Sequence, residues 1–155
     1  MRFTRTDSVA STALVIDSDP LMLTALGAVL DMQGHRCVLA RTEALAMASI
    51  TAGQFDLIIL SIDELQQGCQ FAARLRAPEA NRDVPIIFLV PQLAPHWLSA
   101  LSAHGGVYCL LKPVDPSALL DLVDKALWLP HVAAGRGPLP AGHLTAQPQA
   151  DWVTL

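Results

Sequence analysis

Charged side chains are scarce in this sequence. They make up 15% of the 155 residues, against about 25% in ordinary soluble domains. Lysine occurs only at Lys112 and Lys125, and the formal net charge is −4. This balance argues against non-specific binding to nucleic acid or to anionic membranes. So few charges also indicate apolar surface that a protein partner, or the chain's own C-terminal residues, would cover.

The sequence also lacks the segments and motifs of several protein classes. No apolar run approaches the ~18 residues of a membrane span, and the first apolar run reaches Asp17 too soon for a signal peptide. No G-x-G-x-x-G motif follows a predicted strand, and the histidines have no metal-ligand or catalytic spacing. We therefore expect a cytoplasmic protein that is not an enzyme and has neither catalytic residues nor a cofactor.

The three cysteines do not suggest a disulfide or a zinc site. Cys37, Cys69 and Cys109 are odd in number, lie in three different predicted elements and form no C-x-x-C motif. We expect free, buried thiols in a reducing compartment.

Short apolar runs alternate with segments of helical spacing along most of the chain. With 52% apolar residues, the length suits one domain with a sizeable core. The runs predict strands at 13–16, 37–40, 57–60, 84–90 and 107–111. The helical spacing predicts helices at 20–32, 43–52, 65–75, 95–103 and 116–129. Five strands alternating with five helices indicate a doubly wound α/β domain with a parallel five-stranded sheet.

The pattern is lost at both ends of the chain. Residues 1–11 are expected to form an N-terminal extension, 12–130 the domain, and 131–155 a tail rich in proline and glycine. Trp152 is apolar enough to dock on the domain, but a free C-terminal end is the expectation we favour.

Polar residues follow three of the predicted strands. Asp17 and Asp19 follow the strand at 13–16, Ser61 and Asp63 follow the strand at 57–60, and Lys112 follows the strand at 107–111. Parallel strands bring their carboxyl ends to one edge of the sheet, where ligands bind in such folds. We therefore expect these side chains to meet.

Here the chain resembles the receiver domain of two-component response regulators, over residues ~12–130. The matching segments, in the right order and spacing, are Leu-Val-Ile-Asp-Ser-Asp-Pro, Phe-Asp-Leu-Ile-Ile-Leu-Ser, Val-Pro-Ile-Ile-Phe-Leu-Val and Leu-Leu-Lys-Pro-Val-Asp-Pro. The resemblance implies a flavodoxin-like (βα)5 fold with strand order 2-1-3-4-5. It also implies a cis peptide bond between Lys112 and Pro113.

The resemblance further implies a phosphorylation site. In that family an acidic pair after strand one and an aspartate ending strand three bind Mg²⁺, and that aspartate accepts a phosphoryl group from a histidine kinase. In this sequence Asp17 matches the first acid of the pair, whereas Ser18 stands at the second position. Ser61, five residues after Asp56, stands at the acceptor position.

Two further positions depart from the family. Val90 stands where a serine or threonine would hold the phosphate, and Cys109 replaces the usual switching aromatic residue, whereas Lys112 is kept. A serine hydroxyl without a metal or a base is a poor phosphoryl acceptor. We therefore expect a degenerate, stand-alone pseudo-receiver that aspartyl phosphorylation does not switch and that serves bacterial signalling as a protein-interaction module.

Alternatives remain at this edge of the sheet. Lys112, with no phosphate to meet, is expected to pair with Asp17 or, as the less favoured alternative, with Asp63. Asp63 with Asp17 and Asp19 would form a displaced acidic site. Through it the crevice would bind a metal or a small anionic ligand, or accept a phosphoryl group at Asp63 or Ser61. No bound metal is expected, and Asp17 and Asp63 are the weak candidate ligands for Mg²⁺.

If phosphorylation does not switch the domain, its function depends on surface residues. In the family, the face formed by helix four, strand five and helix five makes dimers and contacts output partners. That region carries Trp97, Tyr108 and Trp128, and tryptophan and tyrosine are enriched at interface cores. We expect these three residues to contact a protein partner or a second copy in a homodimer, unless the tail covers them.

Overall fold

The computed structural model describes residues 11–133 and 151–155 of the chain. Residues 1–10 of the predicted extension and 134–150 of the predicted tail lie outside the described residues. No helix within the described ranges is long and apolar enough to cross a bilayer.

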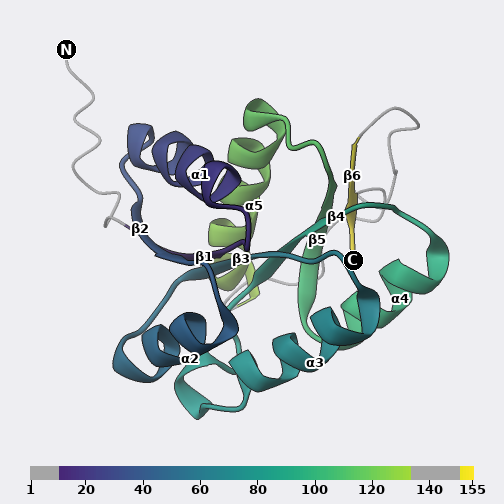
Figure 1. The fold of residues 1–155 in the computed structure, drawn as a ribbon, viewed down its shortest axis with the longest axis horizontal. Helices are drawn as coiled ribbons and strands as arrows, with labels where there is room; N and C mark the ends of the chain where they lie inside the picture. Colours follow the sequence, from purple (N-terminus) through teal and green to yellow (C-terminus); the bar gives the residue numbers. More distant parts are fainter. Residues whose placement is uncertain (1–10, 134–150) are drawn as a thin grey trace.

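Six strands form a single sheet (Figure 1). They are β1 (Thr12–Ile16), β2 (Arg36–Ala40), β3 (Leu57–Ser61), β4 (Ile86–Val90), β5 (Gly106–Leu111) and β6 (Trp152–Thr154). The first five are parallel, in the predicted order 2-1-3-4-5, and β6 is added antiparallel to β5. The predicted (βα)5 receiver fold is therefore confirmed, with one more strand.

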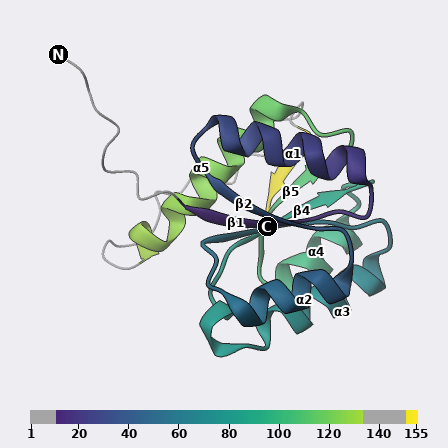
Figure 2. The ribbon, with the colours of Figure 1, turned by 60° about the vertical axis from the view of Figure 1, so that its left-hand side comes forward.

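The helices cover both faces of the sheet (Figure 2). They are α1 (Pro20–Met32), α2 (Glu43–Ala52), α3 (Leu65–Arg76), α4 (Pro95–Ala103) and α5 (Pro116–Ala133), with a 3₁₀ turn at η1 (Glu79–Asn81). α1 and α5 pack on one face, and α2, α3 and α4 pack on the other. The central strands β3 and β4 are consequently buried on both sides, which explains their unbroken apolar sequence.

Side-chain caps fix the starts of α1 and α2. Asp19 accepts a hydrogen bond from the Leu21 backbone N–H, and Pro20 occupies the first turn of α1. The hydroxyl of Thr42 accepts from the Leu45 N–H and begins α2. These two caps turn the chain at the carboxyl ends of β1 and β2.

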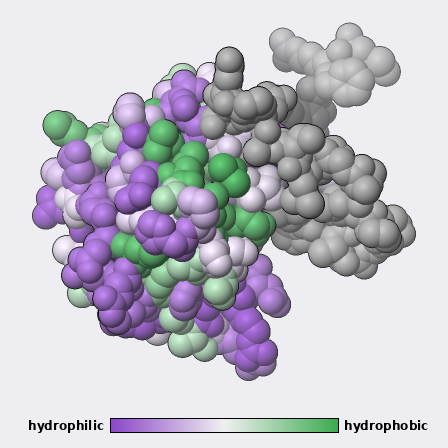
Figure 3. All heavy atoms as spheres, turned by 90° about the vertical axis from the view of Figure 1, so that its right-hand side faces the viewer, coloured by the Kyte–Doolittle hydropathy of each residue, from purple (hydrophilic) through white to green (hydrophobic). Residues whose placement is uncertain are grey.

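Most element bounds agree with the sequence prediction within one residue, and three features differ by more. β4 begins at Ile86 instead of 84, and α5 continues past 129 to Ala133. The prediction of a free C-terminal end is wrong for the described residues, because Trp152–Thr154 pair with β5. The face that carries β6 shows apolar side chains gathered among polar ones (Figure 3).

Candidate functional site

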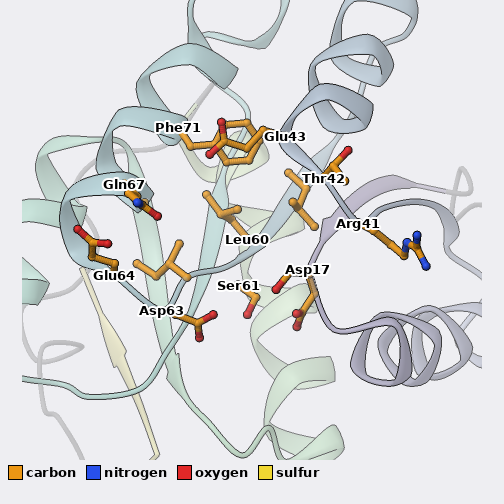
Figure 4. A pocket seen from close by; sticks show the side chains of 14 residues that line it. Asp17, Arg41, Thr42, Glu43, Leu60, Ser61, Asp63, Glu64, Gln67 and Phe71 are labelled. Carbon is orange, nitrogen blue, oxygen red and sulfur yellow. The ribbon is translucent and has the colours of Figure 1, made fainter.

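A pocket of about 330 Å³ lies at the carboxyl ends of β1 and β3 (Figure 4). Asp17 and Ser61 lie side by side in it, because Ile16 and Leu60, which precede them, are partners in the β1–β3 ladder. The turn before α2 and the first turns of α3 form its other walls, whereas the Arg41 side chain points away. This edge of the sheet is the predicted place for a site.

The two acids after β1 are engaged in local structure. Asp17 is buried, with 7% of its surface exposed, and its Oδ1 accepts a hydrogen bond of 2.9 Å from the Asp19 backbone N–H. The Asp19 carboxylate caps α1 through a bond of 3.0 Å from the Leu21 N–H. Asp19 therefore faces its own helix, and of these two acids only Asp17 lines the pocket.

Ser61 ends β3 and is partly exposed at the pocket floor. Its register partner in β4 is Leu89. Its side chain lies beside Asp17 (Figure 4), so the two polar groups at this point are one carboxylate and one neutral hydroxyl.

Lys112 is bound by the loop that follows β3. Its Nζ lies 2.9 Å from Asp63 Oδ1 and 3.1 Å from the Ile62 carbonyl oxygen. The predicted pairing with Asp17 is therefore wrong, and the alternative with Asp63 is confirmed. The physical reason is that Asp63 lies in the loop beside the end of β5, while Asp17 Oδ1 is already bonded to its own turn.

The end of β4 brings no polar side chain to the pocket edge. Val90 is fully buried, and its carbonyl oxygen accepts a hydrogen bond of 2.8 Å from the Lys112 backbone N–H. Cys109 is also fully buried, and this burial raises the pKa of its thiol to about 12. Both side chains belong to the core between the sheet and α3 and α4.

The peptide bond between Lys112 and Pro113 is cis, as the resemblance implied. Of the three free cysteines, Cys109 is buried as predicted, whereas Cys37 and Cys69 are only partly buried.

Comparison with known proteins agrees with this geometry. Residues 13–124 match the response regulator receiver domain family. The chain belongs to that family.

Relatives and solved structures of receiver domains are similar to this chain. The transcriptional regulatory protein GlrR of Escherichia coli is 31% identical over 116 residues, which are 74% of this chain and 26% of GlrR. The phosphate regulon transcriptional regulatory protein PhoB of Pseudomonas aeruginosa is 26% identical over 95% of this chain and 65% of PhoB. This chain thus spans about a quarter of one relative and about two thirds of the other.

Among structures, the chemotaxis protein CheY4 of Vibrio cholerae superposes with a TM-score of 0.70 at 22% identity, covering 75% of this chain and 98% of CheY4. A response regulator from Burkholderia pseudomallei, solved with a phosphorylated aspartic acid and a calcium ion, gives a TM-score of 0.65 at 19% identity, covering 81% and 73% of the two chains. At this identity the likeness is one of fold.

The predicted interface residues of this receiver domain have different environments. Trp97 and Tyr108 are buried, with 6% and 7% of their surfaces exposed, whereas Trp128 is 61% exposed. Trp97 belongs to the core, and Trp152 packs against Tyr108, which agrees with the alternative that the tail covers part of this face. Contact of these residues with a partner stays a prediction, and Trp128 is the exposed residue of the three.

Sequence reasoning missed an arginine that holds two loops of the receiver domain. Arg76, at the end of α3, donates hydrogen bonds to the carbonyl oxygens of His104, Arg82, Val84 and Gly105. Its burial lowers the pKa of the guanidinium, and nearby Asp83 counteracts this in part. Gly105 has a φ of +78°, and a Cβ on it would lie 2.3 Å from Arg76. The Gly105-Gly106 pair at the start of β5 was the available signal.

Proposed function

We propose that this receiver domain is a pseudo-receiver. It does not accept phosphate on an aspartate and acts through one fixed shape, as a cytoplasmic protein-interaction module in bacterial two-component signalling. The observation that carries the proposal is Ser61, a neutral hydroxyl at the end of β3 beside Asp17, where the family has its acceptor aspartate. A serine hydroxyl is a weak nucleophile near neutral pH unless a base accepts its proton, and among the described residues no hydrogen bond joins Ser61 to the Asp17 carboxylate.

The donor set at this pocket does not fit Mg²⁺, which prefers several hard oxygen ligands in octahedral geometry. One Asp17 oxygen is bonded to its own turn, Asp19 caps α1, and Asp63 is paired with Lys112. Within the described ranges, no three His, Cys, Asp or Glu side chains are grouped closely enough to hold a metal ion. Without that charge, phosphoryl transfer loses its main electrostatic support.

The positions that would hold a phosphate also support the proposal. Val90 has no hydrogen-bond donor on its side chain, and the Lys112 ammonium already has two oxygen partners. Two of the three N–H donors of this ammonium are therefore engaged before any phosphate enters the pocket. The chain thus lacks the contacts that would convert phosphorylation into a change of shape.

The test is incubation of the full chain with acetyl phosphate and Mg²⁺, followed by intact-mass spectrometry and peptide mapping. We expect no added phosphoryl group at Asp17, Ser61 or Asp63. A phosphoryl group on any of these three residues would contradict the proposal. A receiver domain with an acceptor aspartate, treated in parallel, serves as the positive control.

A second candidate function is supported by the pocket itself. Its polar lining includes Ser18, Thr42 and Gln67 beside Asp17 and Ser61, which suits a small polar ligand or a cation bound without phosphoryl transfer. Such binding would raise the free energy of unfolding by RT ln(1 + [L]/Kd) and so raise the melting temperature. A thermal shift with Mg²⁺ or with inorganic phosphate would favour this second function, whereas the interaction module predicts no change with either.

A further inference from the structure

The last residues of the chain bind along the free edge of β5. The Leu111 N–H donates to the Asp151 carbonyl oxygen at 2.6 Å, and the Leu155 N–H donates to the Val107 carbonyl oxygen at 2.9 Å. Between these two bonds, Cys109 lies opposite Val153 in the antiparallel ladder. Five residues, 151–155, therefore occupy a strand edge that would otherwise expose unpaired backbone groups.

The side chains of the segment alternate between the two faces of the sheet. Trp152 lies on the α5 face, where its ring meets the Tyr108 ring edge-to-face at 6.1 Å and 82°. The Lys125 Nζ lies 4.6 Å from the centre of the Trp152 ring. Leu155 packs on the opposite face against the core that contains Phe88. An aromatic ring on one face and an aliphatic side chain on the other hold the segment on β5.

The start of β5 is shaped for this segment. Gly106 leaves room for both Leu155 and Phe88, since a Cβ on Gly106 would lie 2.6 Å from Leu155 Cδ1 and 2.5 Å from Phe88 Cε2. No other strand has extensive contacts with β6 within the described part of the chain. The site is thus the outer edge of β5, which we call the β5 groove, with Gly106 at one end and Tyr108 and Lys125 beside its middle.

We propose that the edge of β5 is a peptide-binding groove whose ligand is the segment 151–155, and that a second copy of the chain can supply this segment in trans. The contacts are the same whichever copy provides the strand, and exchange of an identical element is a low-cost route to a dimer. The three strand residues remain partly or fully exposed, so the segment is held at an edge and is not part of the core. A tethered segment has an effective concentration of about 1 mM, so the chain's own segment occupies the groove until it is displaced.

This proposal goes beyond the proposed function and does not depend on it. The groove lies along β5, and none of its contacts involves Asp17, Ser61 or Asp63. Phosphorylation of the pocket would leave the peptide-binding prediction unchanged, and failure of peptide binding would leave the pocket proposal unchanged.

The test uses the full chain with the substitution Val153→Pro. Hydrogen-bonded pairs alternate along an antiparallel ladder, so the bonds at 111–151 and 107–155 place Val153 in a hydrogen-bonded pair with Cys109. Proline removes that donor and should release the segment. The probe is a fluorescein-labelled peptide with the sequence of residues 150–155, followed by anisotropy.

We expect saturable binding to the Val153→Pro chain, with an apparent affinity at least about tenfold tighter than for the unchanged chain, whose groove is filled. The same peptide with proline in place of valine should not bind. Thr154→Ala keeps the backbone donors and should behave as the unchanged chain. A second full-chain variant, Trp152→Ala with Leu155→Ala, removes the two anchoring side chains without touching β5 and should also bind the peptide.

Absence of saturable binding to both releasing variants would overturn the proposal. Equal binding to the releasing variants and to the unchanged chain would overturn it as well, because the peptide would then bind outside the groove.

Discussion

The carboxyl edge of the sheet and the β5 edge of this receiver domain are occupied by different kinds of contact. At the carboxyl edge, Ser61 and Val90 contribute no charge, and Lys112 is paired with an exposed loop acid. At the β5 edge, backbone groups are paired and Trp152 and Leu155 are anchored on opposite faces. The comparison teaches that two edges of one sheet can be occupied in different ways, one by a few polar side chains and the other by backbone bonds and apolar anchors.

The largest expected effect of a substitution is at Gly106, which belongs to the β5 edge. Gly106→Val would force a side chain into the space of Phe88 and Leu155 and should lower the free energy of unfolding by about 3 kcal/mol. Urea denaturation measures this change in the free energy of unfolding. Ala103→Val, at an exposed position of α4, is the control and should change little. Equal stability of the two variants would show that the groove is not closely packed.

Arg76 tests whether the start of β5 is held by its carbonyl contacts. Arg76→Ala removes hydrogen bonds to four carbonyl oxygens and should cost about 2 kcal/mol. Arg74→Ala is the matched control, because Arg74 forms only an exposed pair with Glu43. If Arg74→Ala lost as much stability as Arg76→Ala, the carbonyl contacts of Arg76 would not be what holds the start of β5. Thermal unfolding of the two variants makes the comparison.

Trp152 tests how firmly β6 is attached. Trp152→Ala loses the Tyr108 and Lys125 contacts, for an expected cost of about 1.5 kcal/mol. Hydrogen exchange should speed up at Leu111 and Leu155, whose N–H groups bond across the β5–β6 ladder. Trp128→Ala, at the exposed tryptophan, should leave that exchange unchanged. Slow exchange in both variants would mean that the backbone hydrogen bonds hold β6 on β5 without the Trp152 ring.

A double substitution can restore acidic side chains at the two pocket positions where the family has them. Replacing Ser18 and Ser61 together with aspartate would place new carboxylates beside Asp17 and should create a magnesium site. At Mg²⁺ tenfold above its Kd, the double variant should gain about 1.4 kcal/mol of stability, whereas the unchanged chain should gain none. An equal gain in stability with Mg²⁺ in both proteins would contradict the proposal that the unchanged pocket does not bind Mg²⁺.

The smallest effect is expected at the Lys112–Asp63 pair. Asp63 is 84% exposed, and ion pairs at such positions contribute less than about 1 kcal/mol. Asp63→Asn should therefore change the urea midpoint only slightly, and 1 M salt should reduce the difference further. A large destabilisation would mean that the pair organises the pocket.

The fold was predictable because its signals are local and repeated. Apolar runs buried on both faces mark β3 and β4, and apolar residues at helical spacing mark the helices between the strands. The polar residues that share the carboxyl edge followed from the parallel order of the strands. These inferences needed only the sequence and the rule that parallel strands align their ends.

The remaining features depend on packing between distant segments. A three-residue strand such as β6 has no periodicity of its own, and its place follows from Gly106 and Tyr108 on another part of the chain. The partner of Lys112 depended on how the loop after β3 turns, which spacing does not fix. Trp97 and Trp128 look alike in sequence, and only tertiary packing buries one and exposes the other.

The central claim is that the pocket holds one state regardless of phosphoryl chemistry. The most direct measurement is an amide NMR titration of the full chain with Mg²⁺ and beryllofluoride, a mimic of the acyl phosphate. We predict that the resonances of Asp17, Ser61 and Lys112 stay unchanged through the titration. Saturable shifts at these three residues, extending into β5, would contradict the account and show a working switch.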